Sequence, residues 1–319
     1  MNSLESSRRA LAAADVAAAA QLACLLEASA PKPGNVSPGR TFADARYEDF
    51  LASAAAIGEP LAGAGTRSVG ATVRMAVEAT ARWTRSNTNL GIVLLLTPLS
   101  RAALLPPRID ARSPATFAEP AASPSKSLRS AVRQVLEATS VNDARDVYAA
   151  IRRAAPGGLG RVEAQDVSTD PTMTLLQVMR LAAERDGVAR EYATAFEVTF
   201  DVATPALDRS RRDGLSWDDA VVETFLTLLA AVPDTHVARR GGMALALAVS
   251  QRAHAALAAG GVRSVAGRRA IDDLDRGLRD TRNVANPGTT ADLTAAAIFV
   301  LLLIGGWQPS PDTASEEPR

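Results

Sequence analysis

Helical periodicity recurs along almost the whole 319-residue chain, while the alternation that marks β-strands is nearly absent. In most segments apolar residues return every three or four positions, which places them on one face of a helix. Alanine and leucine dominate these segments, and aromatic residues make up only 4% of the chain. We therefore predict an all-α protein with one compact multi-helix domain over residues 8–307 and flexible tails at 1–7 and 308–319.

Proline and glycine set the predicted boundaries between helices, because neither residue suits a helix interior. Residues 30–39 and 155–160 are breaks of this kind, and 106–125 predicts a surface excursion. Asp170 followed by Pro171 predicts a helix start with Asp170 as its N-cap. We expect the Gly/Pro-rich loops to form a central cleft. The predicted helices span 11–28, 48–57, 66–84, 90–104, 127–138, 143–154, 172–185, 187–211, 216–231, 236–259, 266–282 and 290–305.

Charge and cysteine content exclude several kinds of partner. Lys+Arg and Asp+Glu both total 35, so no net field draws the chain to nucleic acid or to a membrane. Cys24 is the only cysteine, which excludes an internal disulfide and a cysteine zinc cluster. The most apolar run, 295–305, is too short to span a bilayer, and the N-terminus lacks a signal-peptide pattern. We expect a cytoplasmic protein with small-molecule partners, and its oligomeric state stays open.

Two junctions in the first half carry more polar detail than a connecting loop needs. Prolines flank Lys32, and Gly34 lets a ligand or another part of the chain approach closely. The loop therefore either holds Lys32 rigidly as a positive charge that binds phosphate, or is a solvated turn. Asn87, Thr88 and Asn89 stand just before an apolar helix. Their side chains suit helix capping, and the same helix start suits an anion.

Two junctions in the second half add charged groups. Asp234 can cap a helix whose first turns carry Arg239 and Arg240, and Gly241 follows. Arginine near a helix N-terminus opposes the helix dipole, which makes sense if an anion shares the site, although a surface ion pair is the simpler alternative. The last junction, 286–292, places Asp292 in the first turn of the final helix.

Acidic residues between these junctions suggest a metal site. Asp186 and Arg190 are four residues apart and predict an ion pair, whereas Asp166 and Asp170 flank a loop and could reach a hydrated Mg²⁺. The chain has no nucleophile elbow, Walker lysine, Rossmann glycine pattern or His/Cys metal cluster. What remains is phosphate-binding chemistry made from helix ends, cations and carboxylates.

These motifs together resemble the triphosphoribosyl-dephospho-coenzyme A synthase family over roughly residues 20–305. The family's motifs occur in the same order here as PKPG from residue 31, NTNLG from 87, DTHVARRGG from 234 and PGTTADL from 287. The chain departs from the family at Asn89 and Leu90, where the family has His-Lys. It also has Phe42 in place of a histidine, and Thr72 and Arg74 in place of glutamates.

The resemblance implies an all-α enzyme that joins ATP to 3'-dephospho-CoA, or to a related ribose hydroxyl, and releases adenine. It further implies a divergent branch linked to tetrahydromethanopterin-type one-carbon metabolism. ATP would be the substrate that Lys32, Gly34, Asn87, Thr88, Asn89, Arg240 and Gly241 bind, with Mg²⁺ held by Asp234, Asp292, Asp166 and Asp170. Asp234 and Asp292 would serve as the catalytic acids, since the reaction needs proton transfer and stabilisation of an oxocarbenium-like transition state.

Two other functions stay open on the same scaffold. Loss of the His-Lys pair favours a non-catalytic nucleotide-binding protein, and water in place of the acceptor would give an N-glycosidic hydrolase. Adenine release from ATP, with and without acceptor, separates the three functions.

Overall fold

The computed structural model describes residues 11–106, 123–158, 160, 162–280 and 282–307. The tails predicted at 1–7 and 308–319, and most of the predicted excursion at 106–125, lie outside these residues.

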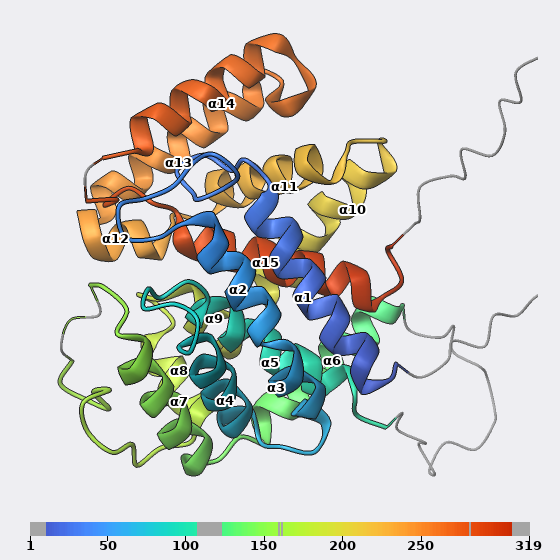
Figure 1. Ribbon diagram of the computed structural model, residues 1–319, viewed down its shortest axis with the longest axis vertical. Helices are drawn as coiled ribbons and strands as arrows, with labels where there is room; N and C mark the ends of the chain where they lie inside the picture. Colours follow the sequence, from blue (N-terminus) through green and yellow to red (C-terminus); the bar gives the residue numbers. More distant parts are fainter. Residues whose placement is uncertain (1–10, 107–122, 159, 161, 281, 308–319) are drawn as a thin grey trace, which may run out of the picture.

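The prediction of an all-α fold is confirmed (Figure 1). Over the described ranges, the only strand-like pairing is an isolated bridge between Ser37 and Arg40. In the first half the helices are α1 (Ala13–Ser29), α2 (Tyr47–Ala56), α3 (Gly58–Ala62), η1 (Gly63–Gly65), α4 (Val69–Thr80), α5 (Leu90–Ala103), α6 (Pro124–Glu137) and α7 (Val141–Ala154). In the second half they are α8 (Leu175–Ala182), α9 (Gly187–Thr194), η2 (Thr199–Ala203), α10 (Thr204–Arg212), α11 (Trp217–Ala231), α12 (Thr235–Gly241), α13 (Met243–Ala258), η3 (Gly261–Arg263), α14 (Val265–Leu278) and α15 (Gly288–Leu303).

The last helix, α15, lies at the centre of the core. It packs against α1, α5, α9, α10, α11 and α12, and Figure 1 shows α1 crossing it. Nearly every residue from Leu293 to Leu301 is buried. A helix that is apolar all round must be covered on all sides, so the final apolar run of the sequence becomes the central helix, and its first turn reaches the site described below.

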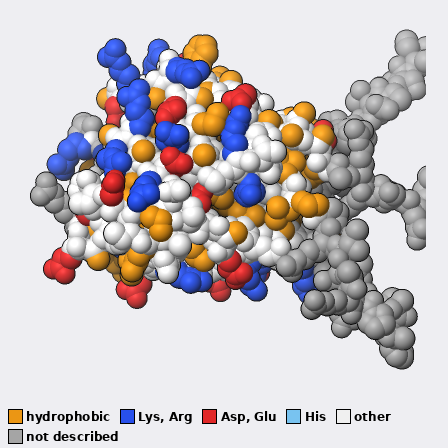
Figure 2. Space-filling view, turned by 90° about the horizontal axis from the view of Figure 1, so that it is seen from below, with side chains coloured by type: hydrophobic (Ala, Val, Ile, Leu, Met, Phe, Trp, Pro, Cys, Tyr) orange, Lys and Arg blue, Asp and Glu red, His pale blue; other side chains and the backbone are white. Residues whose placement is uncertain are grey.

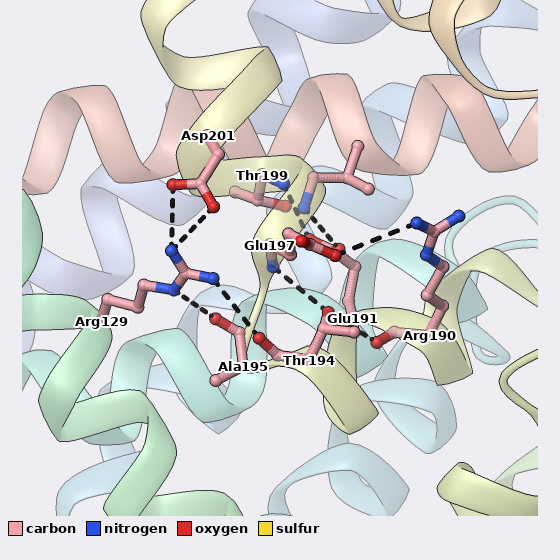
Figure 3. A network of polar contacts seen from close by, with 9 residues as sticks. Arg129, Arg190, Glu191, Thr194, Ala195, Glu197, Thr199 and Asp201 are labelled. Carbon is pink, nitrogen blue, oxygen red and sulfur yellow. Dashed lines mark hydrogen bonds and ion pairs between the residues drawn. The ribbon is translucent and has the colours of Figure 1, made fainter.

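The helix predicted over 187–211 is broken into three parts. Ala195 and Phe196 adopt left-handed backbone conformations, with φ of 52° and 61°, and a π-helical turn follows at η2. The Glu191 carboxylate accepts the backbone N–H groups of Val198 and Thr199 at 3.0 and 2.9 Å (Figure 3). This buried side chain replaces the helical acceptors that the break removes, which periodicity alone does not reveal.

Two other predicted boundaries are wrong. The helix predicted over 236–259 ends at Gly242, whose φ of 87° starts a new helix, α13. The start predicted at Asp170 lies later, because the Thr174 side chain caps α8 by accepting the N–H of Gln177. A local cap in the next turn therefore prevails over the Asp-Pro signal.

On the face that Figure 2 shows, basic, acidic and apolar side chains are interspersed. No one helix in the described part of the chain is long and apolar enough to cross a bilayer. Only α11 and α12 taken together, as a pair bent by 58°, meet the criteria of length and composition.

Candidate functional site

One cavity of about 710 Å³ lies where the starts of four helices meet. Residues from the first turns of α5, α9, α12 and α15 line it, together with apolar side chains of α7 and α8. Its size falls within the range of small-molecule sites. The motifs at 87–91, 234–242 and 287–293, far apart in sequence, each contribute to this one cavity.

Hydroxyl groups join three of these helix starts directly. The N–H of Gly187 donates to Oγ1 of Thr235 at 3.0 Å, and this oxygen lies 3.0 Å from Oγ1 of Thr289. Gly187 has no room for a side chain, because a Cβ there would lie 2.7 Å from Cγ2 of Thr289. The starts of α9, α12 and α15 are therefore held in one arrangement.

The buried carboxylate of Asp234 joins the starts of α12 and α15. One carboxylate oxygen accepts the N–H of Val237 at 2.9 Å and so caps α12. The other accepts both the N–H and the hydroxyl of Thr290, at 2.7 and 2.8 Å. The side chain is buried and does not line the cavity. Asp234 thus links two helices, which is a different role from the catalytic and metal-binding ones predicted for it.

Asp292 is the acidic residue that the fourth motif presents to the cavity. Its carboxylate lies against Gly91 at the start of α5, where a Cβ would come within 1.9 Å of Oδ2. Burial is the main reason that the pKa of Asp292 rises well above its ordinary value. The negative charges of Glu27, Asp234 and Asp186 raise it further, and Arg239 opposes them.

Basic groups and one neutral histidine complete the polar side of the cavity. Arg240 lines it and donates to the carbonyl of Arg282, while Arg239 pairs with Asp186. Burial lowers the pKa of His236 below its ordinary value, so the imidazole is mainly neutral at pH 7. Helix N-termini and guanidinium groups favour anions together. The predicted opposition between the arginines and the helix dipole is wrong, because α12 is short and Arg239 and Arg240 lie in its last turn.

The asparagine loop lines the cavity but is held by the protein itself. Oδ1 of Asn87 accepts the N–H of Leu90, the first residue of α5, at 3.2 Å, whereas Asn89 occupies the N-cap position without a capping bond from its side chain. Asn89 donates to Oγ1 of Thr80 at 3.1 Å, and Thr88 shares a hydrogen bond with Ser53. These side chains shape the wall of the cavity.

Three predicted binding residues lie away from the cavity. Lys32 is fully buried and pairs with Glu27 at 3.0 Å, so the solvated-turn alternative is wrong. The N–H of Gly34 donates to Asp275, and a Cβ there would meet Leu278 at 2.9 Å. Gly241 packs in the same way, since its Cβ would lie 2.3 Å from Leu245. Both glycines serve close packing.

The predicted magnesium site is not assembled. Asp170 is exposed outside the cavity, and the oxygens of Asp234 are occupied by the helix starts. Asp166 does line the cavity, but its carboxylate accepts hydrogen bonds from Val162 and Ser168. Within the part of the chain that the structure describes, no three His, Cys, Asp or Glu side chains are placed to hold a metal ion.

The sequence reasoning missed Glu27, Asp186 and His236, all of which line the cavity. Asp186 does not pair with Arg190 as predicted: it caps α9 through the N–H of Ala189 and pairs with Arg239. Glu27 could have been found, because it is an acid near the C-terminal end of the mainly apolar helix α1, away from the acidic first turn at Asp15.

Comparisons with known proteins agree on one family. A family model described as ATP:dephospho-CoA triphosphoribosyl transferase matches residues 13–310. A protein of Pseudomonas paraeruginosa assigned as a 2-(5''-triphosphoribosyl)-3'-dephosphocoenzyme-A synthase is 39% identical over 128 residues, which is 39% of this chain and 43% of the relative. A Pseudomonas syringae protein assigned the same name is 37% identical over 147 residues, 45% of this chain and 48% of the relative. The chain therefore matches less than half the length of these relatives.

A solved structure shares the fold. It is described as a triphosphoribosyl-dephospho-CoA synthase from Archaeoglobus fulgidus, and it aligns with a TM-score of 0.59 and 28% identity. The alignment covers 80% of this chain and 99% of that one.

Proposed function

The chain belongs to the ATP:dephospho-CoA triphosphoribosyl transferase family, and from that premise we propose that it transfers the triphosphoribosyl group of ATP to a ribose hydroxyl of 3'-dephospho-CoA. One observation supports this most strongly: four helix starts, four arginines and one carboxyl group of raised pKa share a single cavity. ATP brings a polyanion that suits the helix starts and arginines, and the transfer needs a base.

The proposed reaction is a substitution at C1' of the ATP ribose. The bond from C1' to N9 of adenine breaks, and adenine leaves with the electron pair. The acceptor hydroxyl oxygen forms the new bond to C1'. Asp292 takes the hydroxyl proton, adenine takes up a proton from water, and Asp292 then returns its proton to solvent, so charge and atoms balance. The transition state resembles an oxocarbenium ion, which a nearby carboxylate stabilises.

Asp292 is the better of the two predicted acids for the base. It lines the cavity, whereas both oxygens of Asp234 are bonded to helix starts. A base works best when its pKa lies near the working pH, and burial moves the pKa of Asp292 in that direction. Asp234 holds α12 and α15 in place, so its role is positioning.

The triphosphate would lie along the polar side of the cavity. The guanidinium of Arg240 offers donors to phosphate oxygens, and so do the backbone N–H groups of Gly91 and Ile92, which follow the already bonded N–H of Leu90 at the start of α5. Magnesium enters this proposal only as the counter-ion that ATP brings with it, because the described carboxylates do not form a site of their own.

The acceptor would use the apolar side. Val147 and Ile151 of α7 and Val178, Met179 and Ala182 of α8 line that part of the cavity. 3'-Dephospho-CoA carries a long pantetheine arm, which can contact such a wall while its ribose faces Asp292. A short nucleotide acceptor would leave the wall uncovered. The link to tetrahydromethanopterin-type metabolism and the cytoplasmic location stay predictions.

Chromatographic detection of adenine from ATP and Mg²⁺ tests the proposal. Adenine release that requires 3'-dephospho-CoA, with a product whose mass equals the acceptor plus triphosphoribose, supports transfer. Release without acceptor would show hydrolysis instead, and nucleotide binding without release would show a non-catalytic protein.

A further inference from the structure

Lys32 and Glu27 form a charged pair in the interior that the proposed reaction has not yet used. Their side chains are 1% and 5% exposed, and Nζ of Lys32 lies 3.0 Å from Oε1 of Glu27. The ammonium group also donates to the backbone carbonyls of Glu27 and Ala30. Its three protons therefore have partners inside the protein, and Lys32 does not line the cavity.

Glu27 connects this pair to the cavity. It lies near the C-terminal end of α1, which packs along α15, and its side chain forms part of the cavity wall together with Asp292. Cys24 lies one turn earlier on α1. Burial is the main cause that raises the pKa of its thiol, and the negative charges of Glu27 and Asp292 raise it further. The two carboxyl groups thus share one region between α1 and α15.

A buried ion pair seldom increases stability over apolar residues of the same size. An isolated carboxylate at this depth would instead bind a proton and become neutral. Lys32 therefore supplies the counter-charge of Glu27 inside the protein, and the Glu27 side chain lines the cavity. This accounts for a lysine that the sequence suggested as a phosphate ligand but that the fold encloses completely.

We propose that Lys32 and Glu27 are positioning residues that act on the reaction through Asp292, maintaining it as a base, and that Lys32 does not bind nucleotide. The inference rests on the proposed function in assigning the base to Asp292. The charged groups that influence Asp292 come from three elements: Glu27 from α1, Asp186 from the start of α9, and Asp234 and Arg239 from α12. The start of α5 faces it with Gly91. Of these charges, Glu27 has the largest effect.

The first test is the pH dependence of kcat/KM in Glu27→Gln. Removing a neighbouring like charge lowers a carboxyl pKa, so the acidic limb of the profile should move to lower pH by roughly one unit. The plateau rate should also fall, because the base becomes weaker. Glu78→Gln, an exposed acid on α4, is the control and should leave the limb in place.

Lys32 is tested by Lys32→Met and by the double variant Lys32→Met/Glu27→Gln. In the single variant Glu27 loses its counter-charge, and a buried charge without a partner is unfavourable, so the limb should move in the same direction as in Glu27→Gln. The double variant removes both charges and should show the same limb as Glu27→Gln, which keeps the test valid if Lys32→Met alone folds poorly. A higher KM for ATP with an unmoved limb would identify Lys32 as a nucleotide ligand and overturn the proposal.

A second measurement does not depend on activity. Thermal melts from pH 4.5 to 8.5 compare Asp292→Asn with the wild type, each with and without Glu27→Gln. Because the folded-state pKa of Asp292 is raised, the wild type should lose stability relative to Asp292→Asn as pH rises above the ordinary aspartate value. Glu27→Gln should shrink this gap. An unchanged gap, or an unmoved acidic limb, overturns the inference, whereas an inactive wild type with a shrinking gap overturns only the proposed function.

Discussion

The carboxylate of Asp292 occupies the space that a side chain on Gly91 would need, since a Cβ at residue 91 would lie 1.9 Å from Oδ2. The glycine of one motif is thereby fixed by the acid of another, two hundred residues away along the chain. We predict that Gly91→Ala displaces Asp292, lowers kcat at least tenfold and costs about 1–3 kcal/mol of stability. Gly157→Ala is the control for stability, because a Cβ there meets nothing within 4 Å. Equal melting temperatures and rates for both variants would contradict the arrangement.

Asp292→Asn should remove the base without removing the nucleotide site. We expect kcat to fall by about 10²–10⁴-fold, while calorimetric affinity for ATP stays the same or rises, because a negative charge near the phosphates is lost. Asp170→Asn serves as the control, since Asp170 is exposed outside the cavity and was predicted from sequence as a metal ligand. A loss of activity in Asp170→Asn equal to that in Asp292→Asn would argue against this assignment.

Arg240→Ala should weaken ATP binding with little effect on folding. The side chain is exposed at the cavity and its described contact within the protein is the carbonyl of Arg282. Loss of one charge-assisted contact should raise the calorimetric Kd about 10- to 100-fold, corresponding to roughly 1.5–3 kcal/mol. Arg276→Ala, which removes an exposed guanidinium paired with Asp273 on α14, should leave the Kd unchanged.

Added bulk on the α8 wall should affect the acceptor more than ATP. Ala182→Leu fills part of the apolar side, so we expect a several-fold higher KM for 3'-dephospho-CoA with a nearly constant KM for ATP. Leu181→Phe adds similar bulk to the neighbouring position, which is 55% exposed and does not line the cavity. If both variants raised the ATP KM equally, the division of the cavity into two sides would be wrong.

Titration of Glu191 should make the stability of the folded protein depend on pH. Burial raises its pKa above the ordinary value, and its hydrogen bonds from Val198 and Thr199 oppose that rise. A carboxyl group with a raised folded-state pKa contributes stability that is fully present below its unfolded pKa and is lost as pH rises through the folded pKa. The wild type should therefore lose melting temperature from pH 4 upward by a component that Glu191→Gln lacks.

Glu191→Gln should also be less stable than the wild type at low pH. Glutamine has one acceptor oxygen for two backbone donors, and an unsatisfied buried N–H costs about 1–3 kcal/mol. Thr194→Ala, at a partly exposed position in the same turn, is a milder control. Identical pH dependence in the wild type and Glu191→Gln would show that Glu191 does not titrate in this range.

Much of the fold follows from the sequence because periodicity reports which face of a helix is covered. The final run was predicted as a buried helix, and α15 is indeed the core helix. The breaks at Ala195 and Gly242 escaped prediction for a different reason. Each is held by tertiary contacts or backbone conformation, such as the Glu191 carboxylate, that leave no local pattern.

The sequence predicted which motifs form the candidate site better than it predicted the contacts of their side chains. Asn87, Arg240 and Asp292 do line one cavity, as their shared motif order implied. Lys32 could not be placed correctly, since a lysine on a Pro-Gly loop reads as exposed until α1 is seen to supply Glu27 beneath it. Whether Lys32 is buried depends on how helices distant in sequence pack around it, and that packing also decides which acid it pairs with.

The hydroxyl pair of Thr235 and Thr289 has a consequence for how the chain acquires its activity. Because the starts of α9 and α12 gain their third partner from α15, the cavity has no complete polar wall until α15 has packed against them. The same helix is the centre of the core, so the site and the core form together. A nascent chain that has reached α14 holds three of the four sequence motifs, yet it has no place in which to use them.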